Sequence, residues 1–146
     1  MGKVVEIGIS KNKGNKIISV PMVEAVKGRG LINDRNYNQN TDIKKQITLI
    51  EIENIKYYNG IIKENIPALY FRRNIITEGI KLNEYMYKEF FIGNVKVKAH
   101  DLCRPCKYLQ NMLNQTNLIK ELILKAGLRC EILNNGKIFV NDKIKV

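Results

Sequence analysis

The sequence predicts a mainly β domain, either a β-barrel or a β-sandwich. Short segments rich in Val, Ile and Phe recur about every eight to twelve residues, and turn residues separate them. Few segments have helical periodicity, and the chain shows no internal repeat, low-complexity tract or linker. A length of 146 residues suits one domain, because two halves would each have a marginal core. We therefore expect residues 1–146 to form a single domain.

The first half of the chain is predicted to contain four strands, a polar loop and one helix. β-Branched residues dominate the four candidate strands, which are residues 4–9, 17–20, 22–26 and 46–50. The glycine-bearing turn between the first two strands predicts a hairpin. Residues 33–45 are almost wholly polar and are expected to form a loop. Residues 51–62 combine near-helical apolar spacing with acidic residues at the start, which predicts a helix.

The second half is predicted to contain six strands and two short helices. The candidate strands are residues 74–77, 90–92, 95–99, 129–133, 137–140 and 143–146. Both helices follow a pair of cysteines, and the first is expected to begin at about Lys107. The second is predicted from an apolar stripe that ends before Gly127, a typical C-cap residue. The stripe consists of Leu118, Ile119, Leu122, Ile123 and Ala126. No unit of two parallel strands joined by a helix is expected.

The charge of the chain is strongly positive, with a formal net charge of +11. Its 19 lysines are scattered and form no long block, which is more typical of a solvated surface than of a nucleic-acid interface. A nucleic-acid partner is therefore not expected, although a basic module that binds RNA or another polyanion stays open as an alternative. No apolar run is long enough to span a bilayer and no secretory leader is evident, so we expect a cytoplasmic protein without a membrane partner.

The strongest candidate for chemistry is the segment that contains Cys103 and Cys106. Three cysteines in a chain expected to be cytoplasmic do not indicate a disulfide framework. Arg104 and the helix start expected beside Cys106 favour its thiolate, which is the reactive and metal-binding form of cysteine. Such a thiolate is suited to bind a soft metal, carry a persulfide sulfur or exchange disulfides. Burial of both cysteines as small apolar residues is the alternative without function.

Two other interpretations of this segment have weaker support. His100, Cys103 and Cys106 are evenly spaced and Cys130 adds a fourth ligand, but one Cys-x-x-Cys unit with a lone cysteine is a weak zinc signal. A thioredoxin-like motif is expected after a strand of a βαβ unit, which the sequence does not predict. His100 itself is more typical of a polar residue at a strand end than of a catalytic base.

Two arginine-bearing segments are candidates for binding an anion. The first, residues 28–37, contains Arg29 and Arg35 beside glycines that allow a close approach of the backbone to a ligand. The second places Arg72 and Arg73 directly before a predicted strand. An arginine fork suits phosphate or carboxylate groups. If both segments converge with the thiol segment, they form a site for an anionic ligand that bears a soft metal.

Several short motifs follow one another in a specific order and spacing along nearly the whole chain. They are Ser10-Lys11, Val20-Pro21, Gly30-Leu31 with Asp34-Arg35, residues 46–50 with Glu53, residues 74–80, residues 91–93, Pro105-Cys106, Gly136 with Ile138, and residues 142–144. In this order they resemble a MOSC domain, the module found at the C-terminus of molybdenum cofactor sulfurases and as short stand-alone bacterial proteins.

The resemblance implies a compact, mostly antiparallel β-barrel with a few short helices. It also implies that the protein binds molybdenum cofactor (molybdopterin) and carries sulfur toward it, or reduces N-hydroxylated compounds at bound molybdenum. In the family, the cysteine that matches Cys106 is the functional thiol, either a molybdenum ligand or a persulfide carrier. The match assigns cofactor binding to a further set of residues, namely Asp34, Arg35, Arg72, Arg73, Asn74, Thr48 and Lys11.

Two residues depart from the family pattern. Asn33 stands where many relatives have glycine, and asparagine tolerates the left-handed backbone that such a turn requires. Cys103 is a second thiol that short relatives do not need, and it is a candidate catalytic residue that resolves a persulfide on Cys106 by forming a disulfide. The sequence contains no desulfurase domain. Sulfur transfer therefore requires a partner such as a cysteine desulfurase or another sulfur source, and a molybdoenzyme is the expected recipient.

Overall fold

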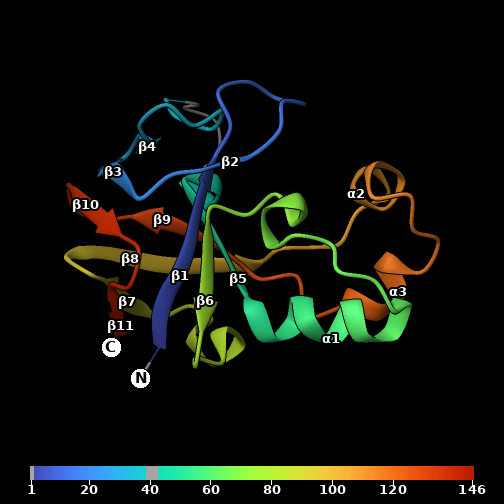
Figure 1. Ribbon diagram of the computed structural model, residues 1–146. Helices are drawn as coiled ribbons and strands as arrows, with labels where there is room; N and C mark the ends of the chain where they lie inside the picture. The colour runs from blue at the N-terminus through green and yellow to red at the C-terminus, as the bar shows by residue number, and fades with distance from the viewer. Residues whose placement is uncertain (1, 39–42) are drawn as a thin grey trace.

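The computed structural model describes residues 2–38 and 43–146, and Figure 1 shows their arrangement. Part of the loop predicted at residues 33–45 lies outside this range. The strands form a closed mixed barrel with a smaller sheet beside it, and the three helices lie together on one side of the barrel. The expectation of a mainly β fold with a few short helices is confirmed.

Seven strands form the barrel in the order β11-β7-β8-β9-β5-β6-β1, and the pairing of β11 with β1 closes it. They are β1 Gly2–Ile9, β5 Ile47–Glu51, β6 Ile75–Glu78, β7 Glu89–Ile92, β8 Val95–Leu102, β9 Leu128–Ile132 and β11 Lys143–Lys145. Every pairing in the barrel except β5–β6 is antiparallel. Closure pairs the strand edges with one another and encloses an apolar interior.

The remaining strands extend or flank the barrel. β2 (Ile18–Ser19) pairs antiparallel with the end of β1, which confirms the predicted hairpin. A three-stranded sheet contains β3 (Met22–Val26), β4 (Gly30–Leu31) and β10 (Gly136–Phe139), with β3 in the middle. β4 lies within the first arginine segment, a few residues before Arg35. The small sheet therefore fixes where that segment leaves the fold.

β5, α1 (Ile52–Ile62) and β6 form a unit of two parallel strands joined by a helix, so the expectation that the chain has none is wrong. α1 carries the chain along the outside of the barrel, and the 3₁₀ turn Ala68–Phe71 returns it to the start of β6. Local periodicity identifies the two strands and the helix. It does not show which strands pair, so the parallel pairing of β5 with β6 is not predicted from it. The thiol segment follows β8 instead, and this unit gives no support to a thioredoxin-like motif.

The two later helices, α2 (Lys107–Met112) and α3 (Leu118–Leu122), pack against an apolar cluster that lies outside the barrel. α2 begins where the sequence predicts, but α3 is shorter than its apolar stripe indicates. Leu118 and Leu122 are buried, whereas Ile119 and Ile123 are exposed, and the backbone leaves the helical conformation at Ile123. No helix among the described residues is long and apolar enough to cross a membrane.

Gly127 contacts β5 instead of capping α3. Its φ of 103° is in the region that favours glycine, and a Cβ at this position would overlap the backbone carbonyl of Leu49. The Cys103 N–H donates a hydrogen bond to the Gly127 carbonyl at 2.7 Å. This close approach fixes the start of the thiol segment against the barrel.

β5 separates two apolar clusters. Ile47 and Leu49 point inward and belong to the cluster that fills the barrel. Ile50 points outward and belongs to the cluster beneath the three helices. Side chains alternate along a strand, so Thr48 faces the same outer side as Ile50. Thr48 lies beyond the cover of the helices, at the floor of a pocket.

Candidate functional site

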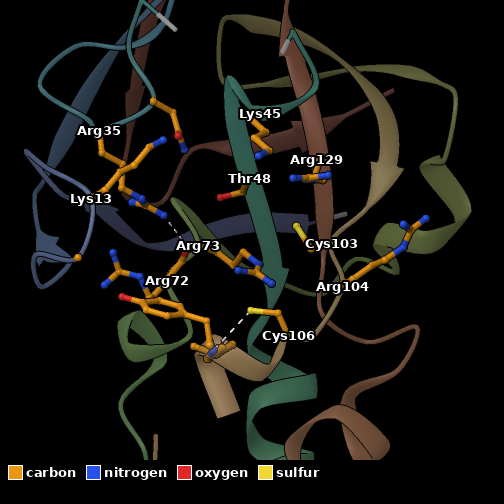
Figure 2. Close-up of a pocket in the computed structure, with 14 residues that line it drawn as sticks. Lys13, Arg35, Lys45, Thr48, Arg72, Arg73, Cys103, Arg104, Cys106 and Arg129 are labelled. Atoms are coloured by element: carbon orange, nitrogen blue, oxygen red, sulfur yellow. Dashed lines mark hydrogen bonds between the residues drawn. The ribbon is translucent and has the colours of Figure 1, made fainter. Parts of the chain in front are cut away.

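A pocket of about 720 Å³ opens on the outer face of β5, where the thiol segment and the two arginine segments converge. Among the residues that the structure describes, seven cationic side chains and no carboxylate line it. The seven are Lys13, Arg35, Lys45, Arg72, Arg73, Arg104 and Arg129. Figure 2 shows Lys13, Arg35 and Arg72 on one side, Lys45, Arg104 and Arg129 on the other, and Arg73 between them. The geometry that an anionic ligand requires is therefore present.

A buried hydrogen-bond network between Thr48 and Asn74 forms the floor of the pocket. The Thr48 hydroxyl donates to Asn74 Oδ1 and accepts the Asn74 N–H, both at 3.1 Å. The Thr48 N–H also donates to Asn74 Oδ1, and Asn74 Nδ2 donates to the Gly8 carbonyl on β1. The hydroxyl is engaged on both sides, so Thr48 shapes the floor and ties β5 to β6 and β1.

The turn at residues 33–36 directs Arg35 into the pocket. Asn33 has a φ of 71°, which confirms that asparagine takes the left-handed position of this turn. The buried Asp34 carboxylate accepts the backbone N–H groups of Ser10 and Asn36 at 3.1 and 3.3 Å. It also pairs with the Arg35 guanidinium at 3.4 Å. Asp34 is therefore a positioning residue behind the pocket wall.

Three arginines crowd together on the wall formed by the two arginine segments. Arg35 donates to the Arg72 carbonyl at 3.2 Å. Burial lowers the pKa of Arg35, Asp34 opposes this change, and the positive charges of Arg72 and Arg73 lower the pKa further. Like charges held this close repel one another, and an anion between them relieves the repulsion.

The backbone before β6 aims Arg72 and Arg73 into the pocket. Arg72 has a left-handed φ of 66°, and such a conformation costs a non-glycine residue about 1–2 kcal/mol. Arg72 donates to the Asn15 carbonyl in the hairpin turn at 2.8 Å. Arg73 donates to the carbonyls of Ala126 and Phe71 at 3.0 and 3.2 Å. These bonds hold both guanidinium groups in place before any ligand binds.

Cys106 is the exposed thiol of the pocket. It occupies the N-cap position of α2, and the Leu109 N–H donates to its Sγ at 3.4 Å. The sulfur is exposed in the same pocket as the cationic side chains. A thiol in this position is accessible for binding a metal or attacking an electrophile.

Cys103 and Cys130 differ from Cys106 because both are buried. Cys103 lines the pocket wall but is only 5% exposed. Burial raises the pKa of the Cys103 thiol, although Arg73 and Arg129 oppose the change. Cys130 lies inside the barrel, and burial raises its pKa well above the ordinary value. Of the three thiols, Cys106 alone is exposed to a ligand.

The wall opposite Arg35 is built around Asp101. Its carboxylate pairs with Arg104 at 3.6 Å and with Arg129 at 3.9 Å. Arg129 is the direct antiparallel partner of Thr48 in the β5–β9 pairing. The register of these two strands therefore brings Arg129 to the pocket floor beside Cys103.

Six of the nine predicted site residues line the pocket, namely Cys103, Cys106, Arg35, Arg72, Arg73 and Thr48. Asp34 and Asn74 are buried behind it and position Arg35 and Thr48. Lys11 instead lines a separate hollow beside Asp34. Arg29 belongs to the first arginine segment but does not line the pocket.

Sequence reasoning missed three cations of the pocket, Lys13, Lys45 and Arg129. Lys13 and Lys45 lie in polar stretches where they are not distinguishable from other surface lysines. Arg129 alternates with buried residues in β9, which is the pattern of any strand with one solvated face. Only the pairing of β9 with β5 indicates its position, and local sequence does not contain that pairing.

His100 lies within β8, not at a strand end, and outside the pocket. Its Nε2 is 2.8 Å from Glu131 Oε1 on the adjacent strand. In the described part of the chain, no group of three or more His, Cys, Asp or Glu side chains is arranged to hold a metal ion. The four residues considered for zinc are therefore not gathered into one site.

The fold and the pocket define a class of protein: a small closed β-barrel that presents one exposed thiol among cations. The sequence model of the MOSC domain matches residues 28–145, and the chain belongs to the MOSC domain family. No curated protein matches the chain.

Solved structures share the same fold. The YUAD protein from Bacillus subtilis superimposes with a TM-score of 0.84 at 14% identity, covering 99% of this chain and 94% of that one. YiiM from Geobacillus stearothermophilus has a TM-score of 0.82 at 17% identity, covering 99% and 74%. YiiM from Escherichia coli has a TM-score of 0.75 at 17% identity, covering 99% and 69%. At these identities the similarity establishes the fold alone.

Proposed function

We propose that this protein binds molybdenum cofactor in the cation-lined pocket and that Cys106 is the thiol that binds its metal or carries sulfur toward it. One observation carries the proposal: an exposed thiol shares a pocket with seven cationic side chains and no carboxylate among the described residues. The general link between the MOSC family and molybdenum cofactor supports it.

The side chains of the pocket fit the chemistry of this cofactor. Its phosphate suits the guanidinium groups of Arg35 and Arg72, and its soft metal suits the Cys106 thiolate. A pocket of about 720 Å³ is within the usual size of a small-molecule site, about 300–1,000 Å³. Within the described residues, ion pairs with carboxylates involve only Arg35, Arg104 and Arg129 of the seven cations. Much of the positive charge is therefore left for a ligand to offset.

Each residue has a separate task in this proposal. When bound, the cofactor supplies a redox-active metal that exchanges oxygen or sulfur ligands. Arg35 and Arg72 bind the anionic end, and Asp34 holds Arg35 in the required orientation. Thr48 and Asn74 keep the floor rigid. Cys106 presents its sulfur at the open side, where a sulfur donor or a substrate can approach.

Delivery of sulfur to the cofactor and reduction of N-hydroxylated compounds both need cofactor bound in the pocket, so cofactor retention is the first test of either. We expect protein from a molybdate-replete bacterial host to contain molybdenum and pterin, measured by mass spectrometry of the metal and by pterin fluorescence. Cys106→Ser should lower the retained molybdenum by at least about ten-fold. Serine is a favoured N-cap residue, so α2 should persist in this variant.

Arg35→Gln/Arg72→Gln should lose both metal and pterin, because the anionic end loses its main partners. The matched control is Lys137→Gln/Lys143→Gln, which removes the same charge from exposed positions on β10 and β11 and should retain both. The proposal is wrong if wild-type protein contains neither molybdenum nor pterin when it is purified from cells in which a co-expressed molybdoenzyme contains its cofactor. A polyanion-binding module would instead bind RNA with a steep salt dependence and without regard to Cys106.

A further inference from the structure

We infer that the pocket also takes a small anionic sulfane-sulfur donor of the thiosulfate class, and that Cys106 accepts its outer sulfur directly. This inference depends on the proposed role of Cys106 as a sulfur carrier and identifies the source of the sulfur. It assigns the protein a sulfurtransferase half-reaction that needs neither a desulfurase nor bound metal.

The first argument is electrostatic. A thiolate and a thiosulfate dianion repel each other in water, so their reaction needs a site that offsets negative charge on both. Seven cationic side chains line the same pocket as Cys106, and no carboxylate among the described residues lines it.

The second argument is the accessibility of the Cys106 sulfur. Cys106 is exposed at the end of the β8–α2 connection, and no described side chain accepts or donates a hydrogen bond at its sulfur. Its one hydrogen bond comes from the Leu109 backbone, on the side of the helix. The opposite side of the sulfur is therefore free for a small anion to approach.

The third argument concerns which thiol reacts. Cys103 shares the pocket but is only 5% exposed, and Cys130 is fully buried in the barrel. Displacement at sulfur requires the attacking sulfur to reach the donor along the bond that breaks. Only Cys106 has that access, so the sulfur should be found on Cys106 alone.

The step balances without an oxidant or a reductant. The Cys106 thiolate attacks the outer sulfur of thiosulfate, and a sulfur–sulfur bond forms to Sγ. The original sulfur–sulfur bond breaks, and its electron pair leaves with sulfite. One thiolate and one thiosulfate dianion give one persulfide anion and one sulfite dianion, so the total charge is unchanged. The cations that bind thiosulfate also stabilise sulfite as it leaves.

The test uses the full chain without cofactor, incubated with thiosulfate at low salt. We expect a mass increase of about 32 Da, the mass of one sulfur, with one sulfite released per sulfur gained. Sulfinic acid adds a similar mass, so the product is then treated with cyanide, which removes persulfide sulfur as thiocyanate and leaves sulfinic acid unchanged. Trypsin does not cleave between Arg104 and Pro105, so fragment-ion sequencing of the shared peptide must assign the sulfur to Cys106 or Cys103.

Two variants test the site itself. Cys106→Ser should gain no sulfur. Lys13→Gln/Lys45→Gln removes one exposed lysine from each side of the pocket and should slow sulfur loading roughly five-fold or more at low salt. Lys137→Gln/Lys143→Gln is the control with the same net charge and should load at the wild-type rate.

The inference is overturned if wild-type protein gains no cyanide-labile sulfur, if the sulfur is on Cys103 or Cys130, or if both lysine variants load equally fast. These outcomes are separate from those of the cofactor experiment. Protein that loads sulfur but retains no molybdenum contradicts cofactor binding alone. Protein that retains molybdenum but does not load sulfur contradicts the donor assignment alone.

Discussion

Ile47 and Leu49 point from β5 into the barrel, where both are fully buried among apolar side chains. Thr48 lies between them, points to the opposite face and forms the floor of the cation-lined pocket. The inner face of β5 is buried on all sides, because the closed barrel surrounds it with apolar side chains. On the outer face, cationic side chains line the pocket around Thr48 and are accessible to a ligand. Alternate residues of one short strand thus fill the barrel and line the pocket.

The largest effect should come from the inner face. Leu49→Ala removes a fully buried side chain and should lower the free energy of unfolding by about 2–5 kcal/mol. Lys45→Gln, four residues earlier on the pocket side, should change it by less than about 0.5 kcal/mol, because an exposed lysine contributes little to stability. Urea unfolding of both variants measures the difference. A loss of similar size in Lys45→Gln would show that the two faces are not separable.

Asn74→Ala tests the network that joins the two faces. Asn74 is 1% exposed and bonds to Thr48 and to the Gly8 carbonyl, so alanine leaves buried polar groups without partners. We expect the free energy of unfolding to fall by about 1–3 kcal/mol. Asn65→Ala, at an exposed loop position, is the control and should be nearly neutral. An equally small effect at Asn74 would mean that the floor does not depend on this network.

Local pattern in the sequence identifies most strands, the start of α2 and five of the predicted site residues that line the pocket, and the family resemblance adds Thr48. These features can be predicted because period-two alternation, β-branched composition and N-cap chemistry each depend on residues only a few positions apart. The thiol segment and the pairs Asp34-Arg35 and Arg72-Arg73 are also local motifs, so their residues are recognisable before the fold is known.

The remaining features depend on contacts between distant residues. The parallel β5–β6 pairing and the partnership of Thr48 with Arg129 follow from strand register, which local composition does not contain. Lys13 and Lys45 reach the pocket only because the hairpin turn and the residues directly before β5 lie beside the outer face of that strand. α3 ends at Leu122, before its apolar stripe does, because Ile123 leaves the helical conformation and Leu124 has a left-handed φ of 63°.

The smallest predicted effect is at Glu51, where β5 leaves the barrel and α1 begins. Burial raises the pKa of the half-buried Glu51 carboxyl, although its hydrogen bond from the Leu82 N–H opposes the change. A carboxyl with a raised pKa binds its proton more tightly in the folded state than in the unfolded chain. The free energy of unfolding therefore falls as the pH rises from the ordinary glutamate pKa through the raised one.

Glu51→Gln removes this dependence while keeping an oxygen that accepts the Leu82 N–H. We expect the variant to match the wild type at about pH 4 and to be slightly more stable at about pH 7, by urea unfolding across that range. Glu24→Gln, exposed on β3, is the charge-matched control. A constant difference between Glu51→Gln and the wild type at every pH would contradict the raised pKa. A difference that grows as the pH rises would show that the ionised Glu51 carboxylate, at the junction of β5 and α1, lowers the free energy of unfolding.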